Sequence, residues 1–200
     1  VIFKIRKIMN NKYSGNVSDF QPVVEDASRV VISYGLKELG DGKAEWFEVV
    51  FYKKQGKPNL EAVKKAVIAD INARTDEKII SGFVWTPEGG DPINVWLSSE
   101  NQFNFAEAQR MAESTPDLIL PVRFKLGEQA DGTPIYHEFT SAEELTDFYH
   151  KAVAHINGTV AAGWIEKDSI DWTPYEQALN PETASTGKKT TRKKKTEAAE

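Results

Sequence analysis

The stretch Ile79–Asn104 constrains the fold most, because two strand signals joined by a turn lead directly into a helix start. Lys78–Trp85 is rich in β-branched and aromatic residues, as strands are. The EGGD turn at 88–91 reverses the chain, and Pro92–Leu97 then has the composition of a second strand. We therefore expect an antiparallel hairpin that is followed at once by a helix running to roughly Glu113.

Polar residues mark where two of the helices begin. Ser98 or Ser99 stands at the N-cap position of the first of them, and Gln102 lies three residues after Ser99, as in a capping box. Thr140 and Glu143 have the same spacing before the last long apolar-periodic segment. These pairs predict helices that open near residues 99 and 141.

The same order of elements occurs three times along the chain. Strand patterns flank a turn and precede an apolar helical stripe in each case. The first round has strands at Arg29–Lys37 and Glu45–Lys54 around GDGK, then a stripe of Leu60, Val63, Val67 and Ile71 in a helix ending near Arg74. The third has strands at Leu118–Leu126 and Ile135–Phe139 and a stripe of Leu145, Phe148, Ala152, Val153 and Ile156.

This pattern predicts an α+β fold in which antiparallel hairpins alternate with helices, as three strand–strand–helix units. The helices should open near residues 59, 99 and 141. The units share a pattern and not residues, so both true internal repetition and the general habit of α+β folds remain open.

We divide the chain into three parts. Residues 1–57 are predicted to supply N-terminal strands, with Val1–Met9 as one of them, and an exposed loop over Asn10–Ala27 that packs on the body. Residues 58–165 form the main α+β domain. From Trp164 the period is lost, so residues 166–200 are predicted to be an extended arm and a basic tail.

The net charge of −5 conceals an asymmetry. Residues 181–200 carry six basic side chains against three acids, a net charge of +3, which leaves −8 on the other 180 residues. The basic residues are Lys188, Lys189, Arg192, Lys193, Lys194 and Lys195. Three interpretations of this tail stay open: a nucleic-acid contact, an arm that orders on an acidic partner, and a solubilising end.

No pattern of catalytic or metal-binding residues stands out. The chain has no cysteine, which excludes a thiolate metal site, a cysteine nucleophile and a disulfide framework. His150 and His155 are five apart on the predicted helix, whereas a metal pair on one helical face needs a spacing of three or four, and His137 lies apart from both. We expect a protein that is not an enzyme and has no cofactor or metal. No apolar run reaches the roughly 20 residues of a membrane helix, so we expect no membrane association.

The segment from about Leu60 to Ile170 resembles a phage-associated domain of unknown function found in tail and tail-fibre-assembly region proteins of tailed phages and prophages. Four pieces carry the resemblance: INARTDEKI at 71–79, SGFVW at 81–85, ENQFNF at 100–105 and FTSAEELTDFYHKAVAHI at 139–156. The resemblance implies a virion structural protein of the tail or neck, made in the host cytoplasm, that acts through protein–protein contacts with other virion proteins in a symmetric oligomeric assembly. A tail-fibre assembly chaperone and a nucleic-acid-associated packaged protein are the alternatives.

Two sets of residues, besides the basic tail, are candidates for structural or functional roles. The structural motif comprises Gly82, Phe83, Trp85, Asn101, Gln102 and Asn104; its amides can cap the free N–H groups of the helix start or brace the preceding strand. Because a tryptophan or tyrosine that a monomer cannot cover tends to end at an interface, Trp164, Trp172 and Tyr175 are candidate interface residues.

Overall fold

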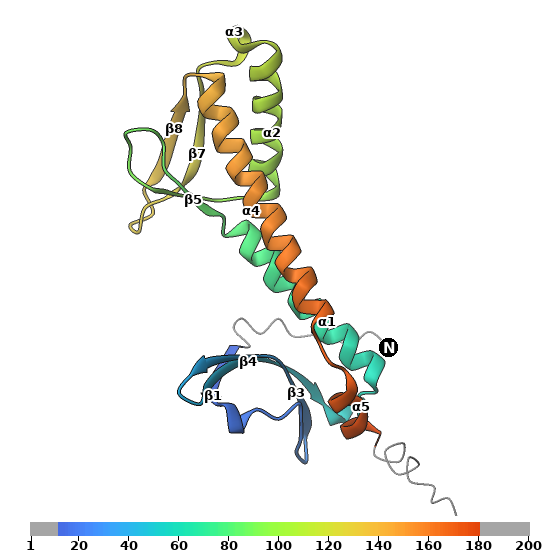
Figure 1. The fold of residues 1–200 in the computed structure, drawn as a ribbon. Coiled ribbons are helices and arrows are strands. Elements are labelled where there is room, and N and C mark those ends of the chain that lie inside the picture. The colour runs from blue at the N-terminus through green and yellow to red at the C-terminus, as the bar shows by residue number, and fades with distance from the viewer. Residues whose placement is uncertain (1–11, 181–200) are drawn as a thin grey trace, which may run out of the picture. The chain divides into compact units, whose positions relative to one another are not determined.

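The structure, a computed structural model, describes residues 12–180 and confirms the α+β fold of antiparallel hairpins alternating with helices (Figure 1). The strands are β1 (Lys12–Asn16), β2 (Val23–Glu25), β3 (Arg29–Gly40), β4 (Lys43–Tyr52), β5 (Phe83–Trp85), β6 (Ile93–Val95), β7 (Val122–Glu128) and β8 (Pro134–Phe139). The helices are α1 (Leu60–Ile80), α2 (Ser99–Ser114), α3 (Pro116–Ile119), α4 (Ala142–Asp168) and α5 (Thr173–Leu179), with 3₁₀ turns η1 (Val17–Asp19) and η2 (Lys53–Gln55).

All three predicted strand–strand–helix units are present. The hairpins β3–β4, β5–β6 and β7–β8 each precede a long helix, and these helices begin at Leu60, Ser99 and Ala142. Ser98, one of the two predicted N-cap residues of α2, accepts a hydrogen bond from the Asn101 N–H, and Ser141, one residue after the predicted Thr140, accepts one from the Glu144 N–H. The side chains of Gln102 and Glu144 bind elsewhere, to the Leu97 carbonyl and to His137. The predicted strand Val1–Met9 lies outside the described residues.

The chain folds into two compact units, and unit 2 is inserted into unit 1. Unit 1 comprises residues 1–67 and 170–200, and unit 2 comprises residues 68–169. Helix α1 therefore contributes its first part to unit 1 and the remainder to unit 2.

Unit 1 is built on a four-stranded antiparallel sheet of order β1-β4-β3-β2. Val30, Ile32 and Tyr34 of β3 are fully buried. Helix α5 packs beside β2, and the hydroxyl of Tyr175 donates to the Ser33 carbonyl at 2.8 Å. The buried Tyr175 and Leu179 are four apart, so they share one face of this short helix.

Unit 2 has two antiparallel hairpins that lie edge to edge, since the Trp96 N–H donates to the Leu126 carbonyl at 2.8 Å. Alternate strand residues enter one hydrophobic core with helices α2 and α4. Aromatic rings dominate that core: Phe148 of α4 has its ring centroid within 5.0 Å of those of Trp85, Phe105 and Phe139. The opposite face of the strands is left to solvent.

Two local predictions were wrong in the first half of the chain. The expected loop Asn10–Ala27 contains strands β1 and β2. Its Gly15 lies against the Trp46 ring, where a Cβ atom would come within 2.9 Å, so a residue read as a loop former is needed for tertiary packing. Helix α1 continues past Arg74 to Ile80, which shortens the expected strand Lys78–Trp85 to Phe83–Trp85.

The predicted extended arm is helical over its described part. Helix α4 continues through Trp164 to Asp168, and α5 covers Thr173–Leu179. Between the two helices, Asp171 accepts a hydrogen bond from the Thr173 N–H at 2.9 Å. The apparent loss of period after Trp164 came from outward-facing apolar residues on a continuing helix, and not from its end.

Candidate interaction surfaces

The predicted motif residues of the second hairpin are structural. Gly82 ends helix α1 with a φ of +82°, and a Cβ atom there would lie 1.6 Å from the Val95 carbonyl oxygen, so only glycine fits. Phe83 packs on the core, and Trp85 is 1% exposed within it. These side chains position the β5–β6 hairpin against α4.

The amides at the start of α2 brace the segment before it. The Asn101 Nδ2 donates to the Trp96 carbonyl at 3.0 Å, and the Gln102 Nε2 donates to the Leu97 carbonyl at 2.7 Å. Asn104 is exposed and makes no such bond to any residue of the described chain. Two of the three amides thus have the bracing role that the sequence indicated.

Two polar side chains at the edge of the core are paired, whereas, among the described residues, the buried Trp85 N–H beside them is not. The His137 Nε2 lies 2.9 Å from the Glu144 Oε1, and the His137 ring meets the Trp85 ring edge-on at 4.8 Å. The buried Trp85 N–H has no acceptor in normal hydrogen-bond geometry within residues 12–180. It still favours the charged form of Asp147, whose pKa is lowered mainly by Lys151, 2.6 Å away, and to a lesser extent by this N–H.

The solvent face of β5–β8 carries large apolar and cationic side chains in alternation, which we call the ladder face. Its members are Val84, Trp96, Arg123, Lys125 and Tyr136, all exposed. The Arg123 guanidinium lies over the Tyr136 ring at 4.5 Å, and the Lys125 ammonium lies over the Trp96 ring at 5.7 Å. Trp, Tyr and Arg are the residues most enriched at the energetic centres of protein interfaces.

Arg123 differs from the other arginines of residues 12–180, which each bind a carboxylate. It has no ion pair to a described residue, although Glu138 faces it across β7 and β8. Lys125, by contrast, is paired with Glu128 at 2.6 Å. Stacking on Tyr136 therefore holds an exposed guanidinium whose donors are free to bind a partner.

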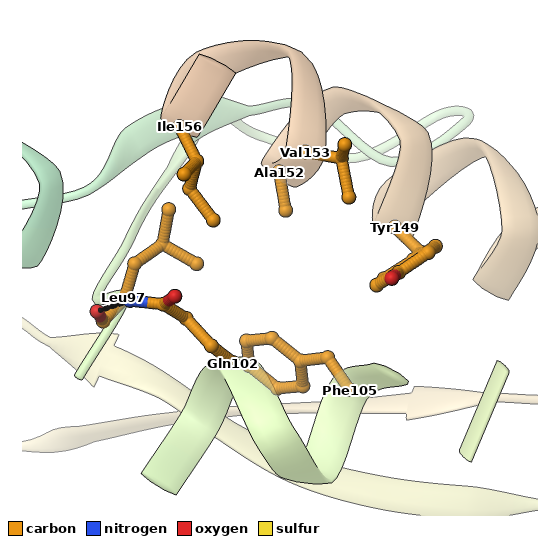
Figure 2. A pocket seen from close by; sticks show the side chains of 7 residues that line it. All are labelled: Leu97, Gln102, Phe105, Tyr149, Ala152, Val153 and Ile156. Atoms are coloured by element: carbon orange, nitrogen blue, oxygen red, sulfur yellow. Dashed lines mark hydrogen bonds between the residues drawn. The ribbon is translucent and has the colours of Figure 1, made fainter. Parts of the chain in front are cut away.

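A cavity of about 160 Å³ lies between α2 and α4, on the core side of the strands (Figure 2). Its lining is mainly apolar and comprises Leu97, Gln102, Phe105, Tyr149, Ala152, Val153 and Ile156. Gln102, Tyr149, Val153 and Ile156 are only half-buried, so solvent reaches the cavity. The cavity holds no cluster of titratable groups.

The second half of α4 presents a further apolar surface. Trp164 and Ile165 are 61% and 70% exposed, whereas their neighbour Gly163 is buried against Thr75 of α1. Arg74 binds Glu166 with a shortest N–O distance of 2.6 Å and thereby fixes the two helices. The exposed pair thus projects from a rigid helix.

The other two predicted interface residues are used within unit 1. Trp172 is half-buried, with its ring centroid 5.5 Å from that of Tyr175. Burial, assisted by Asp171, raises the pKa of the Tyr175 hydroxyl to about 12. The basic residues Lys188, Lys189, Arg192, Lys193, Lys194 and Lys195 lie outside the described residues.

Unit 2 is strongly acidic. Residues 68–169 include 17 acidic and 7 basic side chains, a net charge of −10. Within residues 12–180, no group of three or more His, Asp or Glu side chains is placed to hold a metal ion. Over the same residues, no helix is both long enough and apolar enough to cross a bilayer.

The fold and surfaces define an α+β protein of hairpin–helix units with exposed aromatic faces. Residues 62–185 match the family described as a domain of unknown function (DUF4376), and the chain belongs to this family. Neither the curated proteins nor the solved structures include a significant match.

The sequence interpretation missed the ladder face. Arg123 and Lys125 alternate with the inward Phe124, and Tyr136 lies between the inward Ile135 and His137. That alternation was a usable signal, but the cross-strand register that joins these side chains required coordinates.

Proposed function

We propose that this chain is a structural protein of a bacteriophage particle, a tail or neck component that is made in the host cytoplasm and acts through contacts with other virion proteins. The phage setting of the proposal comes from the resemblance of the four segments within Leu60–Ile170, because the matched family has no assigned function.

The exposed Trp164 and Ile165 are the observation that carries the contact role. Two large apolar side chains, 61% and 70% exposed, occupy consecutive positions of a helix that a salt bridge and a glycine contact hold in place. An isolated protein gains nothing from exposing them, whereas a partner that covers them gains roughly 25 cal/mol for each Å² removed from water.

The test is quantitative mass spectrometry of particles purified from a phage or an induced prophage that encodes the chain. We expect the protein in the mature particle at a fixed ratio to the tail proteins. A photo-crosslinking residue at position 164 should then give one dominant adduct, with a crosslinker at the exposed Leu39 of unit 1 as the matched control. Absence from purified particles, combined with presence in producing cells, would refute the structural role and indicate an assembly chaperone.

A further inference from the structure

We propose that unit 2 associates front to back with a second copy of this chain: the Tyr136 ring of one copy enters the cavity between α2 and α4 of the next, with Arg123 beside it. This inference rests on the proposed assembly role and names the partner and geometry of one of its contacts.

The projecting side of this contact is preorganised. Tyr136 is 52% exposed on the ladder face, and the Arg123 guanidinium lies over its ring at 4.5 Å. Because the stacked arginine has no carboxylate partner among the described residues, its donors remain available at the edge of the ring. A rigid aromatic side chain flanked by an unpaired arginine loses little conformational freedom on binding.

The receiving side has the size of one aromatic ring. An apolar protein cavity of about 150 Å³ takes up a benzene molecule, and the cavity between α2 and α4 measures about 160 Å³. The Gln102 amide stands at its wall: its Nε2 is used by the Leu97 carbonyl, and no described residue donates to its Oε1. That oxygen can accept from the tyrosine hydroxyl, which needs a partner when it is buried.

The charges of the two faces favour the front-to-back arrangement. The helical layer of unit 2, residues 99–119 and 142–157, has seven acidic and two basic side chains, a net charge of −5. On the solvent side of β7 and β8, Arg123 and Lys125 are balanced by Glu128 and Glu138. Contact between two helical layers would oppose like charges, whereas the ladder face is neutral overall, with Lys125 paired to Glu128 and with Arg123 and Glu138 each outside any ion pair between described residues.

The two surfaces lie on opposite sides of the strands, since the cavity is lined by core-side residues and the ladder face by solvent-side residues. When two copies join through two different surfaces, the pair still has one free ladder face at one end and one free cavity at the other. Such a contact continues into a ring or a filament.

The experiment compares the full-length wild-type chain with Tyr136→Ala and Val153→Phe by sedimentation velocity over a range of concentrations. Wild type should associate in a concentration-dependent manner. Loss of the projecting ring, or a phenylalanine that fills the cavity from within, should weaken association at least about 30-fold, the effect of removing an interface hot spot. Tyr52→Ala removes a similarly exposed tyrosine (47%) from unit 1 and should have no effect.

Mixing the two variants gives the decisive result. Each variant retains the surface that the other lacks, so an equimolar mixture should form heterodimers and nothing larger. A wild-type chain that stays monomeric, a Tyr136→Ala variant that associates normally, a Val153→Phe variant that still associates alone because ladder faces pair with each other, or a mixture that stays monomeric would each overturn the inference. None of these results alters the mass-spectrometric test of particle content, so the two proposals fail separately.

Discussion

Substitution of Gly163 in α4 tests whether the close contact between α1 and α4 stabilises unit 2. Replacing a glycine inside a helix by alanine normally stabilises the helix by roughly 0.5–1 kcal/mol. Here an added Cβ atom would lie 2.5 Å from the Thr75 Oγ1 and 3.3 Å from its Cγ2. Thr75 cannot easily turn away, because it is β-branched and its hydroxyl donates to the Ile71 carbonyl at 2.8 Å.

Overpacking of this kind costs about 1–3 kcal/mol, which exceeds the gain in helix propensity. We therefore expect Gly163→Ala to lower the free energy of unfolding by about 1–2 kcal/mol. In a Thr75→Ala background the nearest remaining atom of residue 75 is its Cβ at 3.5 Å, an ordinary contact, so the same change should stabilise by up to about 1 kcal/mol.

Urea unfolding followed by far-ultraviolet circular dichroism gives the four free energies of this double-mutant cycle. Hydrogen exchange of α4 peptides reports unit 2 separately from unit 1. A coupling energy near zero, or a Gly163→Ala variant more stable than wild type in the native background, would show that α1 and α4 are not in close contact at this point.

Three further predictions address single residues. Gly82→Ala should lower the free energy of unfolding by at least about 3 kcal/mol, because it combines a positive φ with a clash against the Val95 carbonyl, and calorimetry showing under about 1 kcal/mol would contradict this. Tyr175→Phe should cost about 1 kcal/mol near pH 7 through loss of the bond to Ser33. Since the folded pKa of about 12 lies above the ordinary value of 10, the stabilisation from Tyr175 is fully present below pH 10 and is lost as the pH rises to about 12, so the urea midpoint of wild type should fall to that of the variant and then below it over that range. Trp164→Ala should change stability by less than about 0.5 kcal/mol, because its ring is 61% exposed, and a larger loss in thermal melts would mean that the ring supports the fold.

The long helices and the hairpins could be predicted from sequence because apolar residues recur with the helical period in the helices and with the strand period in the hairpins. Val63, Val67 and Ile71 recur on one helical face and are fully buried. The sequence also placed the amide of Gln102 at a helix start, where it could either cap the free N–H groups or brace the preceding segment, and the structure shows the bracing bond to the Leu97 carbonyl.

The remaining features depend on contacts distant in sequence. Strand β1 reads as a loop until its Gly15 is placed against Trp46, and the last turns of α4 read as an arm until Gly163 is placed against Thr75. The ladder face needs the register of two hairpins, and the cavity needs the spacing of two helices. Local propensity encodes none of these distances.

The insertion of unit 2 within unit 1 dictates an order of events during synthesis. Tyr175 binds the Ser33 carbonyl, 142 positions earlier in the sequence, so the first unit cannot be completed until α5 has left the ribosome. Residues 68–169 are released earlier, and the Asn72 Oδ1 and Lys167 Nζ, 2.7 Å apart, bring their two ends together. We expect unit 2 to fold before unit 1 is complete. Because its folding brings its two ends together, it lowers the entropic cost of closing the loop when α5 packs on the sheet of unit 1.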